Sequence, residues 1–311
     1  DPLWSRGLGD VYKRQALDDI VGYMPEQRQT MLFSATYPAK IEKTARRIMQ
    51  SPVTVEVQDS HNKQTILQTL YQVANNESRV EAIRLLLQAY RPETTLIFCN
   101  TKIDTDRVAN ELRAVGYAAL ALHGDLEQKQ RDQTLVCFAN RSASVLVATD
   151  VAARGLDIDA LDLVINYQIA SELEVHTHRI GRTGRAGAQG IACSLYVHRE
   201  NHKIGLLEDY LEENFERNDL PDIALLDQPV FYPPMVTLHI AGGKKQKLRA
   251  GDIVGALTGI DGIPGTAIGK IQVGDNWSYV AVTNEHGKTA FNKLNEGTLK
   301  GRSFKVRRLR G

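Results

Sequence analysis

The chain has 311 residues, a length that predicts about two domains of ordinary size. Its 42% hydrophobic and 24% charged residues are typical of a globular protein, and no stretch approaches the ~20 apolar residues of a membrane span. The net charge of +1 hides an asymmetry. Val236 to Gly311 carries 13 Lys and Arg against 5 Asp and Glu, whereas the remainder carries 25 against 32. A basic terminal module predicts an anionic partner, nucleic acid first, although a merely solvated surface would look similar.

The three cysteines, Cys99, Cys137 and Cys193, are far apart and each lies in an apolar stretch. This pattern favours buried core thiols over disulfides, and it contains no zinc spacing, so no metal site is predicted. The N-terminus lacks the basic start, apolar run and cleavage site of a signal peptide. These observations predict a cytoplasmic protein.

Residues 1–15 show no clear periodicity, and a helical pattern begins near Ala16. The apolar run from Met31 to Ala35 predicts a short buried strand, and Ile41 to Met49 predicts a helix. The polar residues from Gln58 to Gln64 predict a linker.

Short apolar strands then alternate with helical stretches up to about Arg217. Strands are predicted at residues 68–74, 95–99, 118–122, 144–149, 163–167 and 191–197. This alternation predicts an α/β fold with a parallel sheet covered by helices on both faces. Ligands of such sheets gather at the carboxyl ends of the strands.

Four prolines, at positions 221, 229, 233 and 234, mark a second linker. The pattern that follows predicts strands or helices at residues 236–243, 248–259, 267–273, 277–282, 287–297 and 303–309. Their order is βαββαβ, the α+β topology of an RNA-recognition (RRM-like) fold.

The sharpest motif is HRIGRTGRAG, from His178 to Gly187. It places arginines three residues apart with glycines between them. The planar guanidinium suits phosphate oxygens, and glycine lets the backbone approach closely. Arginine runs are also common in purely structural roles, so the three arginines alone are weak evidence for a phosphate-binding site.

Five segments in the same order resemble motifs of superfamily-2 helicases in their DEAD-box form. They are SAT (Ser34–Thr36, motif III), LIFCNT (Leu96–Thr101, motif IV), the Gln128 and Arg131 pair, VATDVAARGLDI (Val147–Ile158, motif V) and HRIGRTGR (His178–Arg185, motif VI). Five ordered motifs over ~150 residues make coincidence very improbable. The resemblance implies RecA-like motor domains and an ATP-dependent RNA helicase that uses Mg²⁺.

The resemblance implies catalytic roles for four residues. Arg182 and Arg185 would act as arginine fingers on the γ-phosphate of ATP. Asp157 would accept from the ribose or help to couple the two motor domains, although a helix-start cap is its structural alternative. His178 would contact the first motor domain near SAT, and a satisfied core histidine is the alternative.

Further residues are implied in RNA binding and coupling. Ser34 and Thr36 would link the ATP state to the RNA state, and Asp150 would order the motif V loop. Sequence-independent contacts with the RNA backbone are implied for Thr101, Gly124, Arg131 and Thr149.

The sequence has neither a Walker A pattern nor an Asp-Glu-Ala-Asp motif. Helicases of this family bind ATP and Mg²⁺ mainly through the first domain, so the chain is interpreted as a monomeric fragment with negligible ATPase activity alone. Its predicted parts are a non-native leader (1–15), a remnant of the first RecA-like domain (16–57), the second RecA-like domain (65–217), a linker (218–232) and an RNA-binding domain (233–311).

The terminal domain resembles that of DbpA-type DEAD-box helicases, through VTLHIAGGKKQKLRAGDIVGALTG and AIGKIQV. This resemblance implies binding to a hairpin of 23S ribosomal RNA and a role in large-subunit assembly. Two basic clusters favour phosphate contacts. The clusters are Lys244, Lys245, Lys247 and Arg249, and Lys300, Arg302, Lys305, Arg307, Arg308 and Arg310.

The sheet face of this domain departs from the usual pattern of an RNA-recognition fold. Its first strand offers His239 where an RNA-recognition fold usually carries Phe or Tyr, and its third strand offers Trp277 and Tyr279. We therefore favour the basic clusters, and leave base stacking on the sheet open.

Two other functions are alternatives for this sequence. A non-catalytic RNA-binding protein with a borrowed helicase-like domain would have no reason to keep Arg182 and Arg185 at the motif spacing. A DNA-directed helicase is disfavoured by the basic βαββαβ tail.

Overall fold

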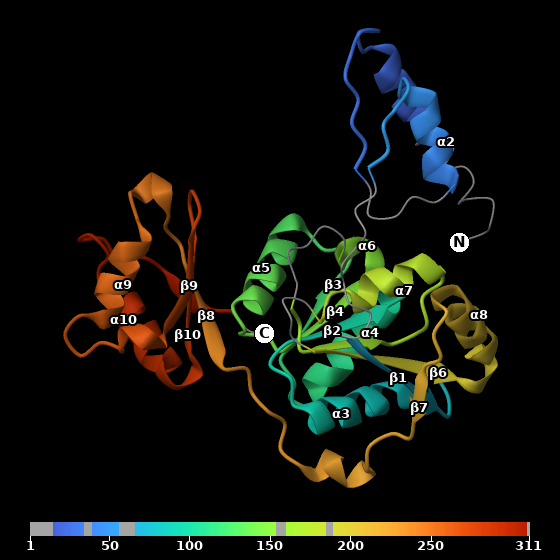
Figure 1. Ribbon diagram of the computed structural model, residues 1–311. Helices are drawn as coiled ribbons and strands as arrows, with labels where there is room; N and C mark the ends of the chain where they lie inside the picture. Colours follow the sequence, from blue (N-terminus) through green and yellow to red (C-terminus); the bar gives the residue numbers. More distant parts are fainter. Residues whose placement is uncertain (1–14, 34–38, 56–65, 154–159, 185–188, 310–311) are drawn as a thin grey trace. The chain divides into compact units, whose positions relative to one another are not determined.

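The computed structural model describes residues 15–33, 39–55, 66–153, 160–184 and 189–309 (Figure 1). The chain forms two compact units, Asp1–Ser60 and His61–Gly311. Some predictions lie outside the described residues: those for residues 1–14 of the leader, Ser34, Thr36, Asp157, Arg185 and Arg310.

The first unit contains a helix over residues 15–22 and helix α2 (Ala39–Ile48), as predicted. An ion pair of 2.8 Å between Arg47 and Asp18 joins the two helices. The predicted buried strand is wrong over residues 31–33, which have no strand structure and leave Phe33 86% exposed. The apolar run there has no neighbouring strand within the described residues of its unit, and a buried strand needs partners for its backbone.

The second unit is built on a sheet of seven parallel strands in the order β3-β4-β2-β5-β6-β1-β7. The strands are β1 (Ile66–Val73), β2 (Thr95–Cys99), β3 (Ala119–Leu122), β4 (Val145–Thr149), β5 (Leu163–Asn166), β6 (Gly190–Val197) and β7 (Glu216–Asn218). The first six confirm the predicted strands. The seventh was missed because its three residues are all polar and exposed.

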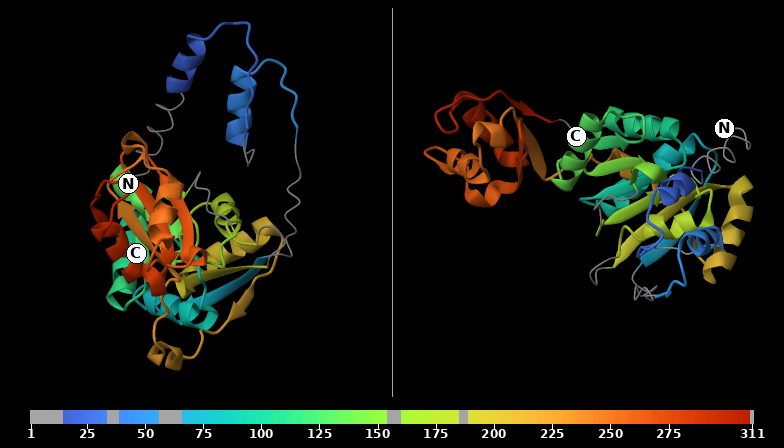
Figure 2. Two further views of the ribbon diagram at one scale, coloured as in Figure 1. Left: turned by 90° about the vertical axis from the view of Figure 1, so that its left-hand side faces the viewer. Right: turned by 90° about the horizontal axis from the view of Figure 1, so that it is seen from above.

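Helices cover both faces of this sheet, because its apolar strands point side chains to alternate sides. In β2, Ile97 and Cys99 pack beneath α3 (Ser78–Tyr90) and α4 (Lys102–Ala114), whereas Leu96 and Phe98 face the other core. That second face carries α5 (Gln128–Ala139), α6 (Asp150–Ala153), α7 (Leu173–Ile180) and α8 (Asn201–Leu211). The fold is therefore the RecA-like α/β architecture that the sequence predicts (Figure 2).

The C-terminal part has an antiparallel sheet in the order β11-β8-β10-β9, with two helices on one face. Its elements are β8 (Met235–Ile240), α9 (Ala250–Thr258), β9 (Ile268–Val273), β10 (Ser278–Thr283), α10 (Gly287–Glu296) and β11 (Val306–Arg308). This confirms the βαββαβ order. Leu238, Ile253, Val280 and Leu294 form the centre of its core.

The segment between the two sheets packs against the larger one. The Gln88 side chain donates to the carbonyl of Gln228 (3.2 Å), and the rings of Tyr117 and Phe231 meet edge to face at 5.7 Å. Both sheets accordingly belong to one compact unit.

All three cysteines are free and buried, which confirms the prediction for them. Burial raises the pKa of each thiol, to about 12 for Cys193. Among the described helices none is both long and apolar enough to cross a bilayer.

Candidate functional site

The candidate site lies at the carboxyl ends of the parallel strands. After β2 the chain goes on to β3, on one side of the sheet. After β5 it goes on to β6, on the opposite side. The edge between β2 and β5 is thus the topological switch point, where ligands of open α/β sheets bind. Asn100 follows β2 and Gln168 lies two residues after β5.

A buried arginine, Arg179 of α7, holds this edge together. Its side chain is 1% exposed, and its Nε and Nη2 donate to the two carboxylate oxygens of Asp150 (2.6 and 2.8 Å). The same guanidinium donates to the Gln168 carbonyl (2.9 Å) and to Asn100 Oδ1 (2.6 Å). A two-pronged, charge-assisted pair of this kind fixes geometry as well as charge. It therefore ties motif V, which contains Asp150, to motif VI.

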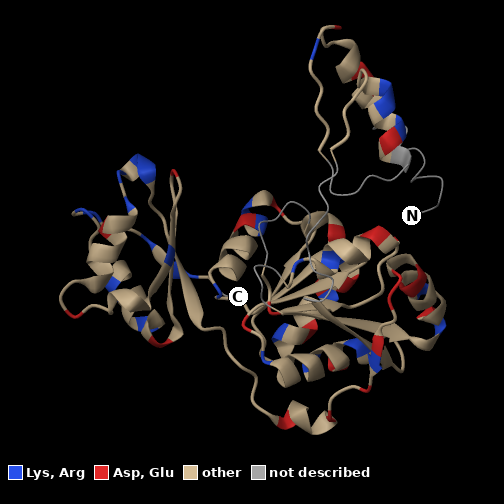
Figure 3. Ribbon diagram, in the orientation of Figure 1, with Lys and Arg blue, Asp and Glu red and all other residues tan. Residues whose placement is uncertain are grey.

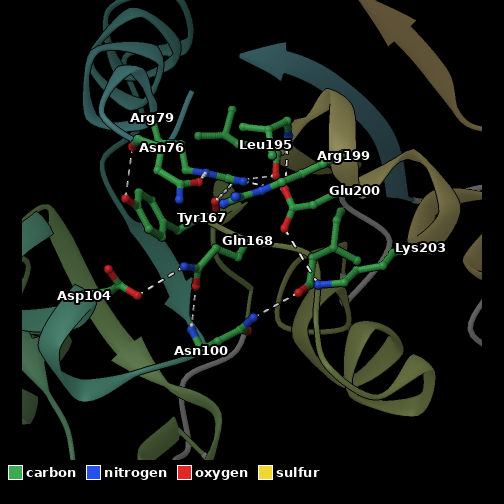
Figure 4. Close-up of polar contacts among 12 residues, drawn as sticks. Asn76, Arg79, Asn100, Asp104, Tyr167, Gln168, Leu195, Arg199, Glu200 and Lys203 are labelled. Carbon is green, nitrogen blue, oxygen red and sulfur yellow. Dashed lines mark hydrogen bonds and ion pairs between the residues drawn. The ribbon is translucent and has the colours of Figure 1, made fainter. Parts of the chain in front are cut away.

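The amide of Gln168 extends this network to the start of α4 (Figure 4). Its Oε1 accepts from the Asn100 N–H (3.1 Å), and its Nε2 donates to Asp104 Oδ2 (3.1 Å). The same Asp104 oxygen accepts from the Thr101 hydroxyl (2.8 Å), and Thr101 caps the helix by accepting from the Asp104 N–H (3.0 Å).

A second buried arginine, Arg79 of α3, joins the ends of β5 and β6. It is 0% exposed, donates to the carbonyls of Tyr167 and Leu195 and forms an ion pair with Glu200. The centroid of the Tyr167 ring lies 5.5 Å from the Arg79 guanidinium and 5.8 Å from that of Arg107, and burial raises the pKa of its hydroxyl. Figure 4 shows Arg79 and Tyr167 beside Gln168.

Four predicted RNA-backbone residues share this edge of the sheet. Thr101, Gly124 and Thr149 lie at or just after the ends of β2, β3 and β4, and Arg131 lies in the first turn of α5. An added Cβ at Gly124 would meet nothing within 4 Å, so the backbone there is open to an approaching ligand.

The predicted catalytic residues that are described lie on or after α7. His178 is in the last turn of that helix, and Arg182 follows it with partial burial. The Arg182 carbonyl accepts from the Leu161 N–H (3.1 Å), which ties this turn to the segment before β5. Their predicted roles concern ATP and the first motor domain.

The predictions missed Asn100, Gln168 and the role of Arg179. All three are polar residues at or just after the ends of helices or strands. Position at a strand's carboxyl end is the signal that could have identified Asn100 and Gln168, whereas Arg179 was hidden within the arginine run of motif VI.

His176, one turn before Arg179 in α7, gives this region a pH dependence. Burial and the nearby Arg179 lower the pKa of His176 to about 4, and its Nε2 lies 3.1 Å from Gln68 Oε1. Because the pKa of His176 is lower in the folded state than in the unfolded state, stability is lost as pH falls from about 6.5 toward 4.

From pH 7 to pH 5 we expect His176 to cause a loss of about 2 kcal/mol in the free energy of unfolding. Urea unfolding at both pH values measures it. A loss unchanged in His176→Phe would contradict this assignment, and the exposed His202 serves as the control position.

The two basic clusters of the C-terminal domain meet at one point. Lys244 and Lys245 lie in a 3-10 turn (Lys244–Gln246), and Lys247 follows with φ 60°. Lys300, from the second cluster, donates to the Lys247 carbonyl (2.8 Å) and pairs with Asp252 (3.2 Å). Figure 3 marks the positions of the Lys and Arg residues along the ribbon of this domain.

The outer sheet face of this domain is only partly accessible. Thr237 is fully buried, and its hydroxyl lies 2.7 Å from Ser142 Oγ and 3.1 Å from Asn140 Nδ2, both after α5. Tyr279 is 4% exposed, whereas Trp277, 4.7 Å from it, is 38% exposed. Base stacking therefore has little room at the centre of this face.

Comparisons with known proteins match both parts. The family "Helicase conserved C-terminal domain" matches residues 78–187, and "DbpA RNA binding domain" matches residues 237–308. A solved structure of S. cerevisiae Dbp5 bound to RNA and ADP BeF3 superposes with a TM-score of 0.59 at 26% identity, over 68% of this chain and 58% of that one.

Two curated relatives align with nearly all of the chain. It is 44% identical over 313 residues to the ATP-dependent RNA helicase DbpA of Escherichia coli (strain K12), and 34% identical over 313 residues to that of Bacillus subtilis (strain 168). The alignments cover 100% and 94% of this chain, but only 66% and 65% of the relatives' own length. With its helicase and DbpA-type RNA-binding domains, the chain belongs to the DbpA-type DEAD-box RNA helicase family.

Proposed function

We propose that this chain supplies the second motor domain and the RNA-specific domain of an ATP-dependent RNA helicase. Its substrate is 23S ribosomal RNA during assembly of the large ribosomal subunit, in the cytoplasm. The observation that carries the proposal is the Arg179–Asp150 pair, which holds motifs V and VI together at the switch point of the sheet. A pure binding module would not require that junction.

On the nucleotide side, we assign the γ-phosphate of ATP to Arg182 and Arg185, and the ribose to Asp157. The guanidinium groups of Arg182 and Arg185 would stabilise the charge that develops on the transferred phosphoryl group. His178 would contact the first motor domain, where Ser34 and Thr36 link the two ligand states. No group of three or more His, Cys, Asp or Glu within the described residues could hold a metal. As the family resemblance implies, we assign Mg²⁺ to the first motor domain, and we assign it no step in this chain.

On the RNA side, Thr101, Gly124, Arg131 and Thr149 would contact the phosphate backbone. These contacts are independent of sequence. Recognition of the ribosomal hairpin would come from the basic surface of the C-terminal domain, built from Lys244, Lys245, Lys247 and Arg249. The motor would then act on a duplex near the bound hairpin.

Deletion of residues 233–311 tests this division. We expect the remaining chain to lose its preference for a 23S rRNA hairpin over an unrelated hairpin, a preference of about 10³-fold in affinity. Weak binding that falls with added salt should remain, because backbone contacts persist. Fluorescence anisotropy with both hairpins at two salt concentrations measures it. Specificity that survives the deletion would overturn the assignment.

A non-catalytic RNA-binding module is the second candidate. Both candidates expect the chain alone to show negligible ATPase activity, because it lacks the Walker A and Asp-Glu-Ala-Asp sequences. The two candidates differ in the result expected once a complete first motor domain is joined to the chain, because only the enzyme then acquires RNA-stimulated ATP turnover.

A further inference from the structure

Gln168 connects motif IV, through Asn100, with motif VI, through Arg179. Its carbonyl oxygen accepts from Arg179, which also binds Asp150 of motif V. Its side-chain amide binds the Asn100 N–H and the Asp104 carboxylate. Gln168 is half-buried at the switch point of the sheet, and has no expected contact with either ligand.

A glutamine suits this junction chemically. The Asn100 N–H needs an acceptor and the Asp104 carboxylate needs a donor, at 3.1 Å each. One primary amide supplies both groups. The Asp104 oxygen bound by Gln168 also accepts from the Thr101 hydroxyl. A single carboxylate oxygen therefore lies between Gln168 and Thr101.

The contacts form a closed ring, so a shift in one member must change another. Asn100 Oδ1 accepts from Arg179 Nη2 (2.6 Å), while the Asn100 N–H donates to Gln168. A shift of Thr101, the N-cap of α4, would move Asn100 directly and Asp104 through the cap hydrogen bond. Both changes reach Gln168, and through it and Asn100 they reach Arg179.

We propose that Gln168 is a positioning residue that couples RNA binding at Thr101 to the Arg179–Asp150 pair. This inference rests on the RNA contact of Thr101 in the proposed function. Chains of packed or hydrogen-bonded groups can carry coupling of this kind between two sites. The ring of Gln168, Asn100 and Arg179 provides such a chain.

NMR on the ¹⁵N-labelled chain tests the coupling without any ATPase measurement. A short oligouridylate is added, and the Thr101 amide and the Arg179 Nε–H are followed. In the wild-type chain both signals should shift with the same midpoint. In Gln168→Leu the Thr101 shift should remain, while the Arg179 shift falls about fivefold or more. The Arg79 Nε–H, bonded to Asn76, is the internal reference.

Gln88→Leu is the matched control, because it also removes a partly buried glutamine hydrogen bond but lies on α3. Its Arg179 response should equal the wild-type response. If Gln168→Leu fails to fold, Gln168→Asn keeps the amide but is one methylene too short for both partners, and should give the same loss.

An undiminished Arg179 response in the Gln168 variants overturns the coupling and leaves the proposed function intact. So does a wild-type chain in which Thr101 responds and Arg179 does not. A wild-type chain in which Thr101 itself is unresponsive overturns its proposed RNA contact, and the coupling with it.

Discussion

When this chain is joined to a complete first motor domain, Arg185→Ala is expected to lower kcat for ATP hydrolysis about 10³-fold or more. The physical reason is that an arginine finger acts on charge that develops only in the transition state. RNA affinity should change little, because Arg185 is assigned to the phosphate of ATP. Steady-state ATPase assays at saturating RNA and an RNA-binding titration measure the two effects.

Arg182→Ala should show the same pattern. Arg141→Ala is the control, because Arg141 is an exposed arginine paired with Glu93 (2.7 Å) outside the candidate site. Turnover that survives in both finger variants would remove the nucleotide assignment.

Arg179→Met is expected to lower the free energy of unfolding by about 3–5 kcal/mol. The substitution removes the positive partner of Asp150, which is 23% exposed, and leaves a partly buried carboxylate without its bidentate donor. The Gln168 carbonyl and Asn100 Oδ1 also lose a donor. Urea unfolding followed by far-ultraviolet circular dichroism measures the change.

A double variant separates the two causes of that loss. If the uncompensated carboxylate dominates, adding Asp150→Asn to Arg179→Met should recover part of the lost stability. Arg179→Lys keeps the charge but not the planar fork, and should fall between the wild type and Arg179→Met. A stability of Arg179→Met within about 0.5 kcal/mol of the wild type, the range of an ordinary surface change, would show that the pair contributes little.

The fold could be predicted from the sequence wherever the signal is local. The strand β2 is a run of five apolar or small residues, and every one of them is buried. The order of the C-terminal elements was predictable for the same reason, since its strands and helices differ in period and are separated by glycines. Exposed strand β7 and the unpaired run at Met31 failed because their structure depends on what lies beside them.

The candidate site was predictable only in part. Motif spacing indicates Thr101, Thr149 and the arginines of motif VI, because these lie within short contiguous segments. The partners of Arg79 could not be predicted, since Leu195 and Glu200 are 116 and 121 residues away in the chain. The burial of Thr237 against Ser142 likewise arises between two domains, which no local pattern encodes.

The three buried cysteines have a practical consequence for studying this protein. A thiol reacts with maleimide as its thiolate, and burial keeps Cys99, Cys137 and Cys193 both protonated and covered at neutral pH. A single cysteine introduced on the surface should therefore be labelled selectively in the otherwise native chain. A second introduced surface cysteine would give a pair of fluorophores that reports a distance within the protein while its core stays unaltered.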